Sequence, residues 1–215
     1  MLEVLSLTVT PFAANCRIFY NKDSKKCIVC DPGDDAKLIT ETIKKHELTP
    51  TAIILTHGHH DHCAAAPELS SLLGVEIYGP TKEDSIWLDH VKEQSAMFGL
   101  PDADNVKVDH FLTDGQKLDF DLGETIKVLH CPGHTPGQVC YYFPLSKLLI
   151  SGDVLFAGSI GRCDFMYSNQ DDLMNAIKTK LFVLDEDVQV LPGHGPNTTI
   201  GRELRMNPFF VPDIY

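Results

Sequence analysis

The sequence has no long hydrophobic run and few positive charges. No apolar stretch approaches the ~18 residues that a transmembrane helix needs, and residues 1–11 lack the basic segment that opens a signal peptide. Lys and Arg number 18 against 30 Asp and Glu, so the net charge of the 215 residues is −12. A surface this acidic repels nucleic-acid phosphates and anionic lipid. We therefore expect a cytoplasmic protein with neither a nucleic-acid nor a membrane partner.

Cysteine provides no disulfide framework. The seven cysteines are an odd number, and a chain of this length does not depend on disulfides. Free thiols in a reducing compartment are the simpler interpretation. Cys27 and Cys30 form a CxxC, but no second CxxC is present to complete a zinc ribbon. The segment from Lys26 to Cys30 is therefore predicted to be a strand.

The hydrophobic pattern predicts one α/β domain over residues 1–215, without a linker, a low-complexity segment or a repeat of fixed period. Strands are expected at 2–9, 17–20, 27–30, 51–56, 75–78, 117–120, 125–129, 138–143, 147–150 and 188–191. Helices are expected at about 35–46, 64–73, 170–180 and 201–206, with a partly helical stretch at 81–100. The order of several strands followed by helices thus occurs twice along the chain. Two sheets with helices on both outer faces, a four-layer αββα sandwich, would satisfy this duplication.

The strongest chemical signal is the segment from Thr56 to His62, with the sequence THGHHDH. It contains a His-x-His-x-Asp-His pattern directly after a predicted buried strand. Imidazole nitrogens and carboxylate oxygens suit Zn²⁺ or another divalent first-row metal. The spacing differs from HExxH, in which two histidines on one helical face hold one metal. A tight loop of this kind can divide its ligands between two neighbouring ions.

Three isolated residues later in the chain share the same local setting. His134, Asp153 and His194 each follow a predicted strand and stand near Gly or Pro. Functional residues in α/β sheets collect on loops at the carboxyl ends of strands. One histidine in a loop is usually just solvated, but this recurrence favours a common metal site.

With these residues, the sequence resembles the metallo-β-lactamase-fold hydrolases, and within them the glyoxalase II type (hydroxyacylglutathione hydrolases). It looks closest to the short bacterial single-domain branch. The similarity covers essentially the whole chain and includes the segments 159–165, 192–196 and 207–209. Longer members have a C-terminal helical domain that supplies much of the glutathione site. The short segment after His194 leaves no room for that domain, so we expect a single domain without it.

The resemblance implies a dinuclear metallohydrolase. The first ion would be bound by His57, His59 and His134, the second by Asp61, His62 and His194, and Asp153 would bridge the two ions. A hydroxide between the ions would attack the thioester of S-D-lactoylglutathione, releasing D-lactate and glutathione in methylglyoxal detoxification. Asp61 and Asp153 are the carboxylates expected to serve catalysis. Zn²⁺ is the expected metal, and Fe and Mn stay open because no thiolate selects zinc.

Arg162 is the candidate substrate-binding residue. It lies a few residues after Asp153, so it is expected near the metals. A guanidinium pairs bidentately with a carboxylate, and glutathione carries two carboxylates. A structural ion pair with Asp164 is the alternative. His130 could orient a ligand, and a packed histidine at the end of a strand is the equal alternative. Cys163 is expected to pack rather than to sense redox state.

Two other activities stay open. Persulfide dioxygenases resemble this sequence and share its Gly-Arg-x-Asp-Phe stretch at 161–165. By that resemblance one Fe(II) would use His57, His134 and Asp153, a two-His-one-carboxylate set. A lactone or ester hydrolase of the same fold would use the same hydroxide. The bridging Asp153 argues against a true β-lactamase, because the resembling subclasses typically lack an aspartate shared between two metals.

Overall fold

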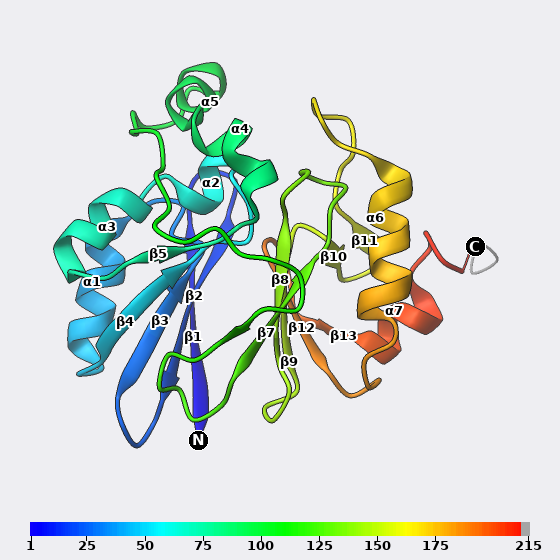
Figure 1. Cartoon of the computed structure of the whole chain (residues 1–215), viewed down its shortest axis with the longest axis horizontal. Helices are drawn as coiled ribbons and strands as arrows, with labels where there is room; N and C mark the ends of the chain where they lie inside the picture. Colours follow the sequence, from blue (N-terminus) through cyan, green and yellow to red (C-terminus); the bar gives the residue numbers. More distant parts are fainter. Residues whose placement is uncertain (212–215) are drawn as a thin grey trace.

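The computed structural model describes residues 1–211. Two β-sheets pack face to face, and helices cover both outer faces (Figure 1). The predicted four-layer α/β sandwich is therefore confirmed. Within the described residues, every helix is too short or too polar to cross a lipid bilayer.

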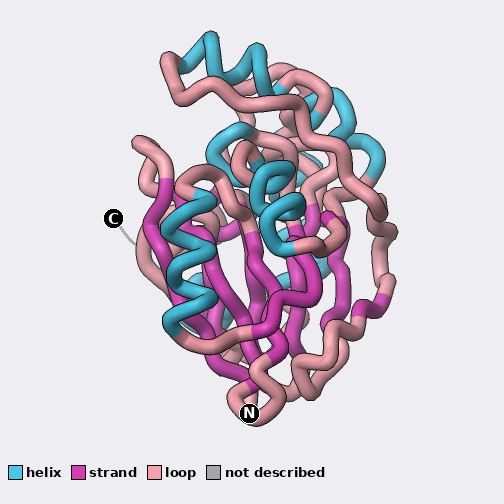
Figure 2. The backbone as a smooth tube through the Cα atoms, turned by 90° about the vertical axis from the view of Figure 1, so that its left-hand side faces the viewer, coloured by secondary structure: helices cyan, strands magenta, loops and turns pink. Residues whose placement is uncertain are grey.

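The first sheet has the strand order β1-β2-β3-β4-β5. Its strands are β1 (Leu2–Val9), β2 (Ala14–Asn21), β3 (Lys26–Cys30), β4 (Thr49–Ile54) and β5 (Ile77–Tyr78). β1 to β3 form an antiparallel meander, whereas β3, β4 and β5 are parallel. The parallel strands are joined through helices α1 (Ala36–Lys45), α2 (His60–Cys63) and α3 (Ala66–Leu73). Figure 2 shows helices lying across this sheet.

The second sheet has the strand order β13-β12-β9-β8-β7-β6. Its strands are β6 (Lys117–Leu118), β7 (Ile126–His130), β8 (Val139–Phe143), β9 (Leu148–Gly152), β12 (Gln189–Pro192) and β13 (Thr198–Thr199). β9 and β12 are parallel. The chain segment that connects β9 to β12 contains the hairpin of β10 (Leu155–Phe156) and β11 (Ser159–Ile160). It also contains the helix α6 (Gln170–Ala176) and its π-helical continuation η2 (Ile177–Leu181).

Short helices connect the two sheets and one more helix follows the last strand. The connecting elements are η1 (Lys82–Asp84), α4 (Ser85–Leu88) and α5 (Val91–Phe98). The last helix is α7 (Ile200–Met206), and its residue Ile200 is buried in the layer that also holds α6. In Figure 1, α4 and α5 lie above one end of the strands.

The buried side chains form three layers that correspond to the three interfaces of the sandwich. Between the sheets, Phe19 of β2 stacks on Phe143 of β8 with ring centroids 5.0 Å apart. β4 contributes to two layers, because Ile53 faces the helices and Ile54 faces the other sheet. This explains why the end of β4 is continuously apolar rather than alternating. Each such buried side chain contributes roughly 1.5–3 kcal/mol to the free energy of folding.

Most predicted elements are confirmed within a few residues. The strand prediction for Cys27 and Cys30 is correct, since both are buried free thiols in β3. The strands expected at 75–78 and 117–120 have only two paired residues each. The helix expected at 170–180 is present, but its second half is π-helical. The two-residue strands β10, β11 and β13 were not predicted, because so short a segment shows no periodicity.

Candidate metal centre

The seven predicted ligands lie at one end of the two sheets, on loops that leave the carboxyl ends of strands. The loop after β4 and the first turn of α2 provide four of them: His57, His59, Asp61 and His62. The loops after β7, β9 and β12 provide the other three: His134, Asp153 and His194. The first sheet therefore supplies one half of the site and the second sheet the other half.

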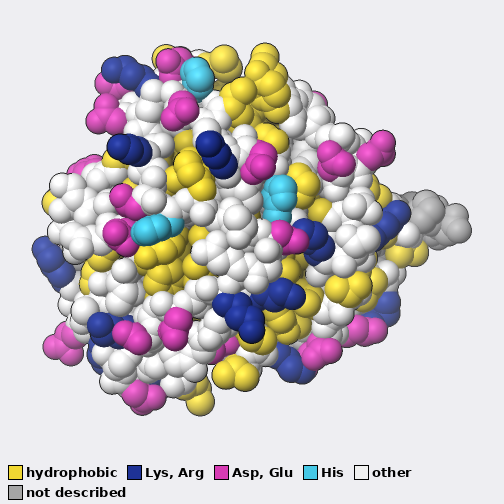
Figure 3. All heavy atoms as spheres, viewed as in Figure 1, with side chains coloured by type: hydrophobic (Ala, Val, Ile, Leu, Met, Phe, Trp, Pro, Cys, Tyr) yellow, Lys and Arg dark blue, Asp and Glu magenta, His cyan; other side chains and the backbone are white. Residues whose placement is uncertain are grey.

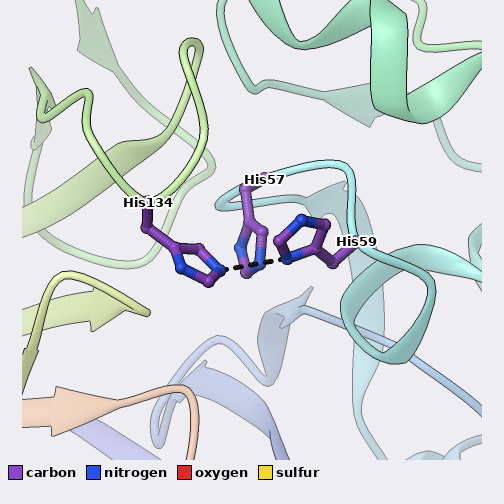
Figure 4. A group of neighbouring side chains, drawn as sticks. All are labelled: His57, His59 and His134. Atoms are coloured by element: carbon purple, nitrogen blue, oxygen red, sulfur yellow. Dashed lines mark hydrogen bonds between the residues drawn. The ribbon is translucent and has the colours of Figure 1, made fainter. Parts of the chain in front are cut away.

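The first group consists of three histidines. The ligand nitrogens of His57, His59 and His134 all lie within 4.8 Å of one another, and these side chains point toward a common centre (Figure 4). Nε2 of His134 is 3.0 Å from Nδ1 of His59. Three imidazole nitrogens at this spacing match a tetrahedral or octahedral ion that keeps open positions.

The second group lies beside the first. Asp61, His62 and His194 also place their ligand atoms within 4.8 Å of one another. Nε2 of His62 is 3.1 Å from Nε2 of His194, which in turn is 3.2 Å from Oδ2 of Asp61. Two imidazoles and a carboxylate again form a nitrogen and oxygen ligand set.

Asp153 lies between the two groups. Its Oδ1 is 3.5 Å from Nε2 of His62, and its Oδ2 is 3.6 Å from Nε2 of both His134 and His194. Among residues 1–211, the buried atoms Oδ1 of Asp153 and Nε2 of His57 have no hydrogen-bond partner. Buried polar atoms without partners are costly, and a bound ion would satisfy both. The cluster therefore fits a dinuclear metal centre.

Asp31, which no sequence pattern singled out, orients two of the histidines. Its Oδ2 lies 3.1 Å from Nδ1 of His62 and accepts a hydrogen bond from Thr56 Oγ1 at 2.7 Å. Because the Thr56 hydroxyl donates to Asp31, it accepts from Nδ1 of His57 at 3.0 Å. The lone pair on Nε2 of His57 then faces the centre. Asp31 directly follows β3, so its position at a strand end was the signal that could have found it.

Backbone carbonyls orient two more histidines. Nδ1 of His134 lies 2.8 Å from the carbonyl oxygen of Arg162, and Nδ1 of His194 lies 3.1 Å from that of Phe12. A carbonyl accepts, so each Nδ1 carries the proton and each Nε2 presents a lone pair to the centre.

The charges of the cluster follow from burial and from close neighbours. Burial and the facing imidazoles lower the pKa values of His57 and His59 well below the ordinary value. Both are therefore neutral, as metal ligands must be. Burial opposes the charged form of His62, but the carboxylates of Asp61 and Asp153 outweigh it and raise the pKa of His62 to about 10. The same carboxylates that attract this proton would attract a cation.

Asp84 at the end of η1 joins two ligand-bearing loops, and it too was missed in the sequence. It is buried and accepts hydrogen bonds from the backbone N–H of Gly58 at 2.8 Å and of Gly137 at 2.6 Å. It also accepts a bond from Thr135 Oγ1 at 2.9 Å. Burial raises the pKa of Asp84 to about 6, so the carboxylate is ionised at neutral pH. No local sequence pattern distinguishes it from the other acidic residues.

The predicted substrate residue Arg162 is engaged elsewhere in this structure. Its guanidinium makes a bidentate ion pair with Asp164, at 3.0 and 2.7 Å, and lies 4.7 Å above the ring of Phe165. The structure thus contains the ion pair that was the alternative interpretation. Nε2 of His130 lies 2.9 Å from the carbonyl oxygen of Pro136, so this histidine contacts the ligand loop rather than a ligand side chain.

Cys163 is half-buried beside another ligand-bearing loop. Its thiol is 3.5 Å from the carbonyl oxygen of Gly133. Burial raises the pKa of this thiol. Since the thiolate is the reactive form, this environment agrees with a packing role.

Comparison with known proteins gives similarities over most of the chain. The sequence model of the family described as "Metallo-beta-lactamase superfamily" matches residues 9–194, a range that includes all seven candidate ligands. A protein of Haemophilus influenzae named "Hydroxyacylglutathione hydrolase GloC" is 40% identical over 97% of this chain and 98% of its own length.

Solved structures agree with the sequence matches. One described as "Crystal structure of BLEG-1 B3 metallo-beta-lactamase" superposes with a TM-score of 0.89 at 36% identity, over 97% of this chain and 99% of the other. Another is described as "Crystal structure of TTHA1623 in a di-iron-bound form". It superposes with a TM-score of 0.86 at 32% identity, over 95% of this chain and 99% of the other. Since the family model spans most of the sequence and these relatives align almost end to end, the chain belongs to the metallo-β-lactamase superfamily.

Proposed function

We propose that the protein is a metal-dependent thioesterase that hydrolyses S-D-lactoylglutathione, or a related 2-hydroxyacylglutathione, to the hydroxy acid and glutathione. The observation that carries this proposal is the position of Asp153 between two groups of ligand side chains. The 40% identity to a relative named a hydroxyacylglutathione hydrolase supports the choice of substrate. In the reaction the C–S bond breaks, and water supplies the hydroxyl of the acid and the proton of the thiol.

We assign one metal ion to each of the two groups of candidate ligands. One ion would be held by His57, His59 and His134, the other by Asp61, His62 and His194, and both by Asp153. We propose Zn²⁺, with Fe and Mn as alternatives, because nitrogen and oxygen ligands accept all three. A solved structure at 32% identity is described as a di-iron-bound form, which supports keeping iron among them.

Each part of the site has a separate task. Two dications bound there would activate a water molecule and polarise the thioester carbonyl. The carboxylates of Asp61 and Asp153 would offset the charge of bound ions. The hydrogen bonds to Asp31, Arg162 and Phe12 keep the histidines in the tautomer that ligation needs. The leaving thiol has a pKa near ~8.5, so departure as a thiolate requires no separate general acid.

The test is hydrolysis of S-D-lactoylglutathione under anaerobic conditions by metal-reconstituted protein, with Asp153→Asn as the comparison. We expect turnover by the wild type and loss of turnover in the variant. Turnover without oxygen would also separate a thioesterase from a persulfide dioxygenase, because an oxygenase consumes oxygen. Absence of turnover by protein that contains two ions would contradict the proposal.

A second candidate function is β-lactam hydrolysis. It is favoured by the 36% identical structure, which is described as a B3 metallo-β-lactamase. The same protein sample should be tested with a chromogenic cephalosporin. We expect the value of kcat/KM to be at least about 100-fold lower than for the thioester, since a site complementary to one transition state binds another less well. The opposite order would favour the second function.

A further inference from the structure

Aromatic side chains pack against the first group of candidate ligands. The ring of Trp87, on α4, lies edge-on to His59 with centroids 4.8 Å apart. The ring of Phe165 lies 5.2 Å from His59 and 5.6 Å from His134. These rings contact the candidate ligand imidazoles directly, so they lie beside the position where the ions would bind.

Three more aromatic residues lie near the site: Phe12 beside His194 of the second group, Phe98 beside Phe12, and Tyr167 beside Trp87. Phe12, in the turn between β1 and β2, lies edge-on to Phe98 at the end of α5 with centroids 6.0 Å apart. The carbonyl of Phe12 also contacts His194. Tyr167 lies 6.3 Å from Trp87. The exposed fractions of Phe12, Phe98 and Tyr167 are 47%, 50% and 53%.

We name as the aromatic rim the five residues Phe12, Trp87, Phe98, Phe165 and Tyr167. In Figure 3, hydrophobic side chains lie at the upper edge of the molecule, on the side where Figure 1 places α4, α5 and the loop that precedes α6. Exposed apolar side chains that cluster beside a site are typical of ligand-binding surfaces.

The rim is attached firmly to the ligand-bearing loop. Gln94 of α5 is buried, and its Nε2 donates to the carbonyls of Gly58 at 3.1 Å and Trp87 at 2.9 Å. Its Oε1 accepts from the backbone N–H of His60 at 2.9 Å. One side chain therefore fixes α4 and α5 against the loop, so Trp87 and Phe98 of the rim are preorganised for a ligand.

The charge beside the rim is already neutralised. The guanidinium of Arg162 covers one face of Phe165 while Asp164 balances its charge. The ligand surface that meets the rim therefore encounters aromatic rings and a compensated ion pair. This environment suits an apolar group better than a carboxylate.

From these contacts we infer that the aromatic rim binds the acyl part of the substrate, and that the preferred acyl groups are aromatic 2-hydroxyacyl groups. The inference rests on the proposed thioesterase function and names its substrate class. A phenyl ring inserted at the rim could form the edge-to-face contacts that aromatic rings favour, at centroid distances of about 4.5–7 Å.

The experiment compares two glutathione thioesters that differ only in a phenyl for a methyl group, S-mandeloylglutathione and S-lactoylglutathione. With metal-loaded protein, we expect kcat/KM to be ~10-fold or more higher for the mandeloyl compound, because the phenyl group adds apolar contact with the rim. Phe98→Ala should bring this ratio close to one. Leu72→Ala, an exposed apolar residue on α3 that is 59% accessible, is the matched control and should keep the wild-type ratio.

The outcomes separate the two proposals. Equal or slower hydrolysis of the mandeloyl thioester would overturn the inference while leaving the thioesterase function standing. Hydrolysis of neither compound would overturn both. A dimer in solution that Phe98→Ala dissociates, with an unchanged substrate ratio, would assign the aromatic rim to contact with a second copy and would also overturn the inference.

Discussion

At the scale of the residue, each candidate ligand histidine is held by a partner on its other nitrogen or by a neighbouring ring. Asp31 has the widest influence, because it contacts His62 directly and His57 through Thr56. It adopts a left-handed backbone conformation with φ of 52°. Asn tolerates that conformation as well as Asp does, so Asp31→Asn changes the chemistry with little backbone strain.

We expect Asp31→Asn to weaken metal binding by ~10–100-fold, since the partner that orients His62 loses its charge. Competition with a chromogenic chelator measures the dissociation constants. Asp34→Asn, at a neighbouring position outside these contacts, should bind metal like the wild type. Identical affinities in Asp31→Asn and wild type would remove Asp31 from the orienting role.

Arg162 allows a second test at this scale. If its guanidinium leaves Asp164 to bind a glutathione carboxylate, Arg162→Ala should raise KM by roughly tenfold and change kcat little, since ground-state and transition-state binding fall together. Steady-state kinetics with S-D-lactoylglutathione measure both constants. An unchanged KM would leave Arg162 with the structural ion pair alone.

At the scale of the element, the site depends on loops that belong to different sheets. Asp84 accepts hydrogen bonds from the loop that carries His57 and from the loop that carries His134, and so connects the two loops. Removing its side chain leaves three buried donors without their acceptor, and each costs about 1 kcal/mol or more.

Asp84→Ala is therefore expected to lower the free energy of unfolding by about 3 kcal/mol. Chemical denaturation of the metal-free protein measures this loss. Asp89→Ala, on the exposed C-cap of α4, is the control and should stay within about 0.5 kcal/mol of the wild type. A loss no larger for Asp84→Ala than for Asp89→Ala would show that the two loops are held by other contacts.

Two kinds of feature could be predicted from the sequence: elements with a clear hydrophobic pattern, and candidate ligands that follow a strand. β1 alternates and the end of β4 is continuously apolar, and each pattern has a packing cause. The candidate ligands His134, Asp153 and His194 could be proposed because each follows a strand beside Gly or Pro, and the other four because they form the His-x-His-x-Asp-His pattern. Asp84 could not be found in this way, because its partners Gly58 and Gly137 meet it only through tertiary folding.

At the scale of the whole molecule, the candidate centre joins the two halves of the sandwich. Four of its ligands follow β4 of the first sheet, and three follow strands of the second. Ions that bind the folded state alone stabilise it by about 4 kcal/mol per site at a thousandfold excess over Kd.

Adding two equivalents of Zn²⁺ to the metal-free protein should therefore raise Tm by ~8–16 °C per tightly bound ion, at about 2–4 °C per kcal/mol. Calorimetry or near-UV circular dichroism measures the shift. His90→Ala, an exposed histidine outside the site, should respond like the wild type, and His194→Ala should show a clearly smaller shift. The same Tm with and without metal would contradict a centre that links the sheets.

The most direct test of the central claim is the metal content of reconstituted protein, measured by inductively coupled plasma mass spectrometry alongside circular dichroism. The account predicts two ions per chain in the wild type. In folded Asp153→Asn it predicts one ion or fewer, because the shared carboxylate is lost. Two tightly bound ions in the variant, or a single ion in the saturated wild type, would contradict a dinuclear centre bridged by Asp153.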